Sequence, residues 1–352
     1  MIAVISFAPN NPWIFFSHIS RTSCRGPRGG SGMTFLCLNT SEKEVFLMGI
    51  LTRRILQNSW KKNLRNDTAR KASQSPPENV GSARDLAYIN DGDQMHLVDI
   101  FYPEDTQGKL PVIIDVHGGG WMYGDKELNE YFCMNLAVMG FAVADMSYRL
   151  LPATDLRGQI QDVFACIHWL HNNGGAYHCD FDNVLLTGDS AGGHLVSLAA
   201  AINEDEALCQ LYGVRKLPFK PAGVVINHGV YDLRAKIVTS EPVMREMERL
   251  WFGRRPKENP IYERSGLPGT ADSKTYPPVL VITSAADGLF PHSEALMRYL
   301  DKNGFEYELC APDPGAQGAE KLGHVFNVLH PEWKESAAVN RDIAEFFRKR
   351  VK

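Results

Sequence analysis

A serine flanked by glycines stands inside the stretch VLLTGDSAGGHLVSLAAAI, residues 184–202. Gly188, Ser190 and Gly192 fit the pattern G-x-S-x-G, which places a serine on a sharp turn from a strand to a helix. The aliphatic run before the turn predicts a buried strand, and the Ala-rich run after it predicts a helix. Such a turn exposes the hydroxyl and points a helix N-terminus at any oxyanion that forms beside it. Ser190 is therefore a candidate nucleophile, and a glycine turn without chemistry is the alternative.

A serine hydroxyl is a poor nucleophile unless a base, a residue that orients the base, and donors for the oxyanion lie in reach. The glycine run at 117–120, HGGG, directly follows the apolar stretch VIIDV. Consecutive glycines leave backbone N–H groups accessible to a ligand, as in an oxyanion loop. A phosphate-binding loop is excluded because no G-K-[ST] follows and the spacing is not G-x-G-x-x-G.

Two further residues could complete the chemistry, because each follows a predicted strand. Asp287 comes after VLVIT, and His324 lies in the loop after the last predicted strand. The chain order Ser, Asp, His is the order expected of an α/β-hydrolase. Other residues stay open for these roles, namely His228, His292 and His330 as the base and Asp313 as the orienting carboxylate.

The elements that must position these residues alternate between strands and helices from about residue 95 onward. Several strands are continuous apolar runs, which is typical of a mostly parallel sheet covered by helices on both faces. The predicted strands are 95–102, 112–116, 142–146, 184–187, 223–227, 279–283 and 307–310. The predicted helices are about 127–139, 155–172, 191–203, 293–303 and 333–350. Together with the chain order of the three residues, this leads us to expect an α/β-hydrolase fold with a mostly parallel central sheet and flanking helices.

The chain divides by composition into three parts. Residues 1–47 are irregular and Gly/Arg-rich, and we expect an N-terminal extension outside the folded domain, with Met48 as a working start. Residues 48–80 begin with a basic helix and are expected to form a separate N-terminal region. Residues 81–352 are expected to form the hydrolase domain, interrupted by an insertion at about 234–276.

Composition limits the remaining possibilities. Of 352 residues, 44% are hydrophobic and 22% are charged, as in a globular protein, and the net charge of −4 argues against nucleic-acid binding. Seven cysteines occur without a C-x-x-C pair, which favours free thiols, a cytoplasmic location and no zinc site. No apolar run is long enough to span a bilayer, so stable membrane insertion is not expected.

Taken together, the motifs resemble one known family. HGGGW at 117–121, GDSAGG at 188–193, DGL at 287–289 and HVF at 324–326 look like the hormone-sensitive-lipase-like carboxylesterases of the α/β-hydrolase superfamily. The resemblance covers about residues 85–350.

This resemblance implies a role for each candidate. Ser190 would be the nucleophile, His324 the general base and acid, and Asp287 the orienting carboxylate. The oxyanion donors would be the backbone N–H groups of Gly119, Gly120 and Ala191.

A cap built from residues 48–80 and 234–276 is also usual in that family. Within the insertion, EPVMREMERLWFG at 241–253 has one apolar face, which fits either core packing or the lining of a substrate pocket. The pocket residues that we expect are His117, Trp121 and Trp251.

The expected function is a serine carboxylesterase that hydrolyses short-acyl esters through an acyl-enzyme, without a metal or cofactor. An amide or acyl-peptide hydrolase would use the same triad, and a non-catalytic ligand-binding protein of the same fold is the alternative from another class. The expected partner is a small-molecule ester, and the oligomeric state stays open.

Overall fold

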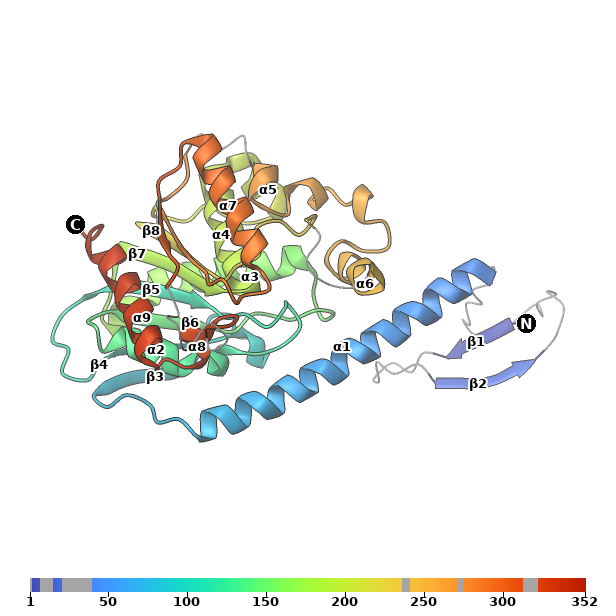
Figure 1. Cartoon of the computed structure of the whole chain (residues 1–352), viewed down its shortest axis with the longest axis horizontal. Helices are drawn as coiled ribbons and strands as arrows, with labels where there is room; N and C mark the ends of the chain where they lie inside the picture. Colours follow the sequence, from blue (N-terminus) through green and yellow to red (C-terminus); the bar gives the residue numbers. More distant parts are fainter. Residues whose placement is uncertain (1, 7–14, 21–39, 236–240, 271–274, 313–321) are drawn as a thin grey trace. The chain divides into compact units, whose positions relative to one another are not determined.

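The computed structural model describes residues 2–6, 15–20, 40–235, 241–270, 275–312 and 322–352 (Figure 1). The chain divides into two compact units, Met1–Leu56 and Gln57–Lys352. In the first unit, strands β1 (Ile2–Ser6) and β2 (Phe15–Ser20) pair antiparallel. Helix α1 (Thr40–Ala72) begins before Met48 and continues into the second unit, so the helix expected from Met48 onward is present.

A twisted sheet forms the centre of the second unit. Within the described residues it has eight strands in the order β10-β9-β8-β7-β5-β6-β4-β3. Strands β5 to β10 run parallel, whereas β4 is antiparallel to β6 and β3 is antiparallel to β4. The strands are β3 (Val80–Ala87), β4 (Leu97–Pro103), β5 (Leu110–Val116), β6 (Ala142–Met146), β7 (Cys179–Asp189), β8 (Gly223–Asn227), β9 (Val279–Ile282) and β10 (Tyr307–Cys310).

Helices cover both faces of this sheet (Figure 1). One face carries α2 (Glu130–Ala137), α8 (Phe326–Leu329) and α9 (Lys334–Arg348), whose apolar side chains join those of the strands in one buried core. The other face carries α3 (Leu156–Asn173), α4 (Ala191–Glu204), α5 (Glu206–Tyr212) and α7 (Phe290–Asn303). This arrangement confirms the expected mostly parallel sheet flanked by helices.

Burial explains why the strands could be read from the sequence. All five residues of β6 and of β8 are buried, and both strands have the predicted bounds. Strand β3 was missed because it is an edge strand with polar residues and a register shift between Ala83 and Leu86. Helices α5 and α8 were also missed because they are too short to show a helical period.

The insertion at 234–276 contains α6 (Glu241–Phe252) and short 3₁₀ turns at Pro256–Glu258, Tyr262–Arg264 and Leu267–Thr270. Residues 236–240 and 271–274 of this segment lie outside the described residues. Met247, Leu250 and Trp251 on the predicted apolar face of α6 are buried, and α6 packs against α3. Among the described helices, none combines the length and apolarity that a bilayer crossing needs.

Candidate active site

Ser190 lies on the turn between β7 and α4, with φ 51° and ψ −114°. This conformation is strained for a residue with a side chain and persists only where the surroundings impose it. A Cβ on Gly192 would collide with the carbonyl oxygen of Val116, and one on Gly188 would collide with the Gly192 backbone. The two glycines therefore let strand and helix pack closely enough to hold Ser190 in this turn.

Three predicted residues meet at the carboxyl ends of the parallel strands. Nε2 of His324 lies 2.9 Å from Oγ of Ser190, and Nδ1 of the same ring lies 2.9 Å from Oδ1 of Asp287. In the tautomer with the proton on Nδ1, the imidazole donates to Asp287 and accepts from the Ser190 hydroxyl. The geometry is that of a nucleophile, a base and an orienting carboxylate in series.

The carboxylate is the buried end of this series. The Asp287 side chain is 1% exposed, whereas the His324 side chain is 38% exposed. Burial alone raises the pKa of Asp287, but hydrogen bonds from His324 and from the Leu289 N–H outweigh it, so the net shift is downward. Asp287 is therefore ionised at neutral pH. A hydrogen bond from Ser284 Oγ to the Leu322 carbonyl ties its loop to the histidine loop.

The three alternative bases make no hydrogen bond to Ser190 among the described residues. His228 is buried with Nδ1 2.8 Å from Asn227 Oδ1, and its ring meets that of His324 edge to face at 5.8 Å. His292 is buried against the Tyr231 N–H, and His330 stacks on a tryptophan at 4.0 Å. Asp313 lies outside the described residues.

The glycine loop after β5 lies beside the serine turn. Gly119 and Gly120 have φ values of 102° and 58°, a region that suits glycine. A Cβ on Gly119 would collide with the Tyr123 carbonyl. The N–H groups of Gly119, Gly120 and Ala191 have no acceptor among the described residues, so all three stay available to a ligand.

A second layer of polar groups, which the motifs alone did not reveal, supports the glycine loop. The Gly118 N–H donates to Asp189 Oδ1 at 2.9 Å, and the Tyr148 hydroxyl donates to the His117 carbonyl at 3.0 Å. Asn129 Nδ2 donates to Asp189 Oδ1 and to Asp115 Oδ2, both at 2.8 Å. The available signal was the aspartate beside the serine and the aspartate two residues before HGGG.

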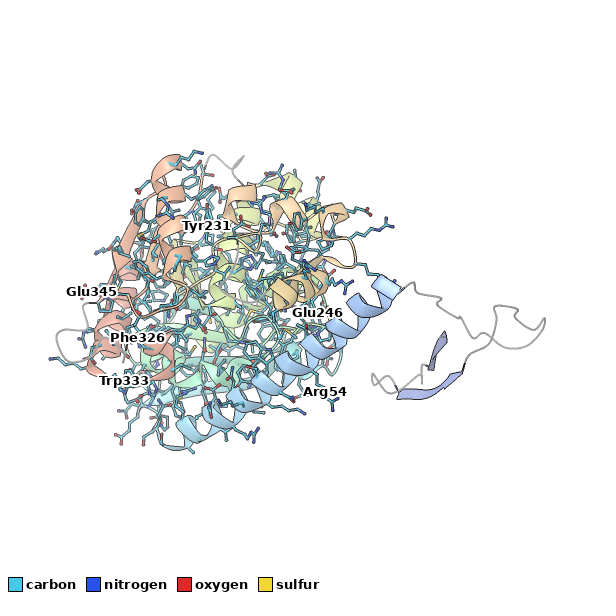
Figure 2. All side chains as sticks on the ribbon, turned by 45° about the vertical axis from the view of Figure 1, so that its right-hand side comes forward. Arg54, Tyr231, Glu246, Phe326, Trp333 and Glu345 are labelled. Atoms are coloured by element: carbon cyan, nitrogen blue, oxygen red, sulfur yellow. The ribbon has the colours of Figure 1, made fainter. Side chains whose placement is uncertain are left out.

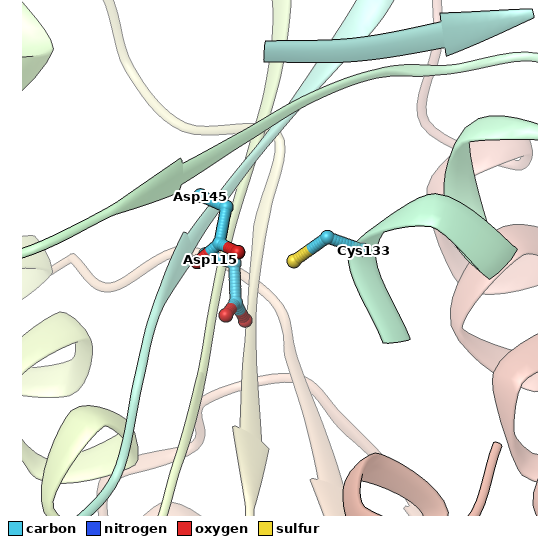
Figure 3. Close-up of side chains that lie close together, drawn as sticks. All are labelled: Asp115, Cys133 and Asp145. Carbon is cyan, nitrogen blue, oxygen red and sulfur yellow. The ribbon is translucent and has the colours of Figure 1, made fainter. Parts of the chain in front are cut away.

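Two carboxyls and a thiol meet below this layer. Asp115 and Asp145 are partners in neighbouring strands, and their oxygens and the Cys133 sulfur lie within 4.8 Å of one another (Figure 3). Burial, followed by the charge of Asp189, raises the pKa of Asp115 to about 8. Burial and the charge of Asp115 also raise the pKa of Asp145. Among the described residues this is the group close enough to hold a metal ion. The raised pKa of Asp115 means that this acid is neutral at pH 7.

The predicted pocket residues are all buried. The His117 ring stacks on Tyr148 at 4.4 Å, and burial lowers the pKa of His117 to about 4, so the ring is neutral. Trp121 and Trp251 meet edge to face at 4.9 Å, joining the glycine loop to the insertion. Their contact with a substrate stays a prediction.

The second half of α1 reaches the same loop. Trp60 stacks on Tyr123 at 5.5 Å with an interplanar angle of 5°, and its ring blocks the Cβ direction of Gly120. The Tyr123 hydroxyl donates to Asp67 Oδ2 at 2.7 Å. Near His324, the ring of His228 meets that of Phe326, which is labelled in Figure 2, edge to face at 5.7 Å. Aromatic rings thus lie beside both the glycine loop and the proposed base, His324.

The chain is similar to known ester hydrolases. The BD-FAE family model matches residues 98–300. Esterase LipQ of Mycobacterium tuberculosis is 29% identical over 207 residues, covering 58% of this chain and 49% of that protein. Carboxylic ester hydrolase LipM of the same organism, described as probable, is 29% identical over 214 residues, again covering 49% of its length. The chain thus spans about half the length of these curated relatives.

Solved structures give a longer match. Esterase B from Lactobacillus rhamnosis is 33% identical with a TM-score of 0.79, covering 86% of this chain and 95% of that chain. An esterase from the bacterial hormone-sensitive lipase family is 22% identical with a TM-score of 0.64 and shares the fold, covering 90% of this chain.

Proposed function

The chain belongs to the BD-FAE family, within the α/β-hydrolases that its motifs resemble, and on that premise we propose that it is a serine carboxylesterase acting on short-acyl esters. The observation that carries the proposal is the unbroken series from Ser190 Oγ through His324 to Asp287, with both hydrogen bonds at 2.9 Å.

In the proposed reaction the Ser190 oxygen attacks the ester carbonyl carbon while His324 Nε2 takes the hydroxyl proton. Asp287 holds the ring and stabilises the imidazolium that forms. The free N–H groups of Gly119, Gly120 and Ala191 stabilise the carbonyl oxygen as it gains negative charge.

His324 then gives its proton to the leaving alkoxide, and an acyl-enzyme remains on Ser190. Water repeats the cycle, with His324 again as base, and releases the acid. Every proton in this scheme passes through one imidazole, whose exposed fraction of 38% leaves it accessible to water.

Two observations support a preference for short acyl groups. The similar Esterase B has been crystallised with a C4-C4 tributyrin phosphonate inhibitor, which is a short-chain ester mimic. In this chain Trp251 is fully buried and packs edge to face on Trp121, beside the glycine loop. A long acyl chain that had to displace these rings would cost about 1–3 kcal/mol through overpacking.

The test is hydrolysis of p-nitrophenyl esters with acyl chains of two to sixteen carbons. We expect kcat/KM to peak between acetyl and hexanoyl and to fall for longer chains, because each added methylene gains only about 0.8 kcal/mol until it meets a wall. A maximum at palmitate would contradict the short-acyl preference. Faster cleavage of the matching p-nitroanilides would identify an amide hydrolase, and inactivity on every ester would contradict the esterase itself.

We further infer that residues 48–80 and 234–276 form the cap and that residues 1–47 lie outside the catalytic domain. Trp60 and Trp251, from these two segments, approach the glycine loop directly or through Trp121. A chain beginning at Met48 is expected to keep esterase activity and Tm. Loss of folding in that shortened chain would contradict the assignment of residues 1–47.

The described cysteines bear on location. Cys133, Cys166, Cys179, Cys209 and Cys310 are free thiols, which supports a reducing, cytoplasmic compartment.

A further inference from the structure

The side chain of Asn129 does not make the hydrogen bond that is usual for an asparagine at its position. It is the N-cap residue of α2, and asparagine at that position commonly accepts a hydrogen bond from its own helix. Here the side chain makes no such bond. Its Nδ2 donates instead to Asp115 Oδ2 and Asp189 Oδ1, both at 2.8 Å, and the residue is 1% exposed.

The orientation of the amide follows from its partners. Both neighbouring atoms are carboxyl oxygens. A carboxyl group accepts when it is ionised, and its carbonyl oxygen still accepts when it is protonated, whereas only the NH₂ group of an asparagine can donate. Asn129 therefore bridges two acidic side chains that would otherwise face each other in a buried space. Without Asn129, Asp115 Oδ2 would lose its asparagine donor, and an unsatisfied buried polar group costs about 1–3 kcal/mol.

Asp189 connects this bridge to the proposed chemistry. It is the residue before Ser190, and its Oδ1 also accepts the Gly118 N–H at 2.9 Å. Gly118 precedes Gly119 and Gly120, whose N–H groups are free. A Cβ on Gly118 would collide with Asp189 Oδ2, so the loop and the carboxylate are in direct contact. Asp189 Oδ1 thus accepts hydrogen bonds from both the Asn129 side chain and the glycine loop.

Burial affects the protonation of both Asp115 and Asp189. Burial raises the pKa of Asp115 to about 8, so this group is protonated at neutral pH. Burial also raises the pKa of Asp189, and the hydrogen bonds from Asn129 and Gly118 offset only part of that rise. Asp189 Oδ1 accepts from two donors, Asn129 Nδ2 and the Gly118 N–H, so its position is fixed from both sides.

We propose that Asn129 is a positioning residue: by fixing the Asp189 carboxylate it holds the glycine loop at the distance from Ser190 that the oxyanion requires. Asn129 itself touches no substrate and acts through Asp189 and Gly118. This inference rests on the proposed ester hydrolysis, because the loop has a catalytic role only if an oxyanion forms beside Ser190.

The test compares Asn129→Leu with the matched control Asn203→Leu. Asn203 is also a fully buried asparagine with two backbone partners, Leu217 and Phe219, but it lies outside this network. We expect Asn129→Leu to lower kcat on p-nitrophenyl acetate about 10- to 100-fold with little change in KM, because displaced donors weaken transition-state binding. Asn203→Leu is expected to lower Tm without lowering kcat.

Two further measurements separate positioning from simple destabilisation. The inhibition constant of a boronic acid, which mimics the tetrahedral intermediate on serine, should rise by the same factor as kcat falls. If the leucine variant does not fold, Asn129→Ala is measured instead, and a smaller loss of kcat with the same unchanged KM is expected. Wild-type kcat in a folded Asn129 variant, or an equal loss in Asn203→Leu, would overturn the proposal.

Failure of the proposed function would be recognised separately. A wild-type protein that cleaves no ester would contradict the esterase, whereas the loop position can still be measured in crystals of the wild type and of the folded Asn129 variant. There the Gly118 N–H should leave Asp189 Oδ1. An unchanged Gly118 position in the variant would overturn the positioning role whatever the activity.

Discussion

One row of side chains crosses the sheet on the face covered by α2, α8 and α9, and its two halves differ in character. Register pairs each member with the next across neighbouring strands. The row reads Asp99, Asp145, Asp115, Thr187, Val225, Leu280 and Glu308, from β4 to β10. The first half is acidic and buried, the next two members after Thr187 are apolar and buried, and the last residue is at the opposite edge.

The two halves support different parts of the site. The acidic half includes Asp115, in the strand that leads into the glycine loop. Asn129 Nδ2 donates to Asp115 and to Asp189, and Asp189 accepts the Gly118 N–H. The apolar half lies in strands β8 and β9. Strand β9 ends before the loop of Asp287, and its neighbour β10 ends before the loop of His324. Those loops carry their own hydrogen bonds, so the strands below them need only pack. The glycine loop thus has polar side chains beneath it, whereas the strands next to the loops of the acid and the base contribute apolar side chains.

The largest expected effect is at the reacting residues, which belong to neither half of the row. Ser190→Ala and His324→Ala are each expected to lower kcat by ~10³ or more, with Asp287→Asn lowering it somewhat less. Steady-state kinetics with p-nitrophenyl acetate give the measurement, and Tm serves as the control for folding. Near-native activity in His324→Ala, with loss of activity in His292→Ala, would show that the base is misassigned.

In the apolar half, Leu280→Ala is expected to reduce the free energy of unfolding by about 2–5 kcal/mol, because it leaves a cavity among buried side chains. Leu280 is 3% exposed within the core that α2 and α9 share. Urea unfolding at pH 6.5 and pH 8 should give the same loss at both values. A loss that changes strongly between them would mean that the apolar half is coupled to the acidic half.

The acidic half should make stability depend on pH. The folded-state pKa of Asp115 is raised to about 8, so above the unfolded-state value the folded protein holds a proton that the unfolded chain has lost. Stability from this group therefore falls as pH rises toward 8. The slope approaches about 1.4 kcal/mol per pH unit for each such group.

The window between pH 6.5 and 8 isolates this effect. Burial lowers the pKa of His117 and His194 to about 4 and that of His228 to about 3, so these rings oppose the trend only below about 6.5. Asp115→Asn has no proton to lose and should show a shallower decline than the wild type. An unchanged slope would mean that Asp115 is ionised in the folded protein.

The smallest effect is expected at the outer end of the row. Glu308 on β10 forms ion pairs with Lys349 at 3.0 Å and with Arg350 at 3.2 Å, and its side chain is 39% exposed. Glu308→Gln should reduce the free energy of unfolding by less than about 1 kcal/mol, and added salt should narrow the difference. A larger loss that persists in high salt would mean that this edge contributes more than an exposed pair.

The sequence predicted the reacting residues better than the residues that support them. Ser190, Asp287 and His324 could be found because each follows a predicted strand, and parallel strands bring their carboxyl ends together. Asn129 could not be found, because its role depends on which strands are neighbours, and β5 lies between β6 and β7 only in the folded sheet.

Some fold elements were hidden for a related reason. The start of β7 is CDFDN, which is polar and gives no strand signal, although it pairs with Leu110 and Pro111 of β5. The row Asp99, Asp145 and Asp115 also reads as three separate acidic residues until register aligns them. Tertiary pairing, not local propensity, decides both cases.

The buried thiols give the molecule a set of built-in chemical probes. Burial raises the pKa of Cys133 beneath the glycine loop and raises that of Cys310, at the edge of the sheet, to about 12. Since only the thiolate reacts with alkylating reagents, both sulfurs stay inert until their surroundings open. The rate at which iodoacetamide labels each cysteine, read by peptide mass, therefore reports how often that part of the molecule opens. Comparing these two labelling rates would measure the local stability of the glycine-loop foundation against that of the sheet edge in a single sample of native protein.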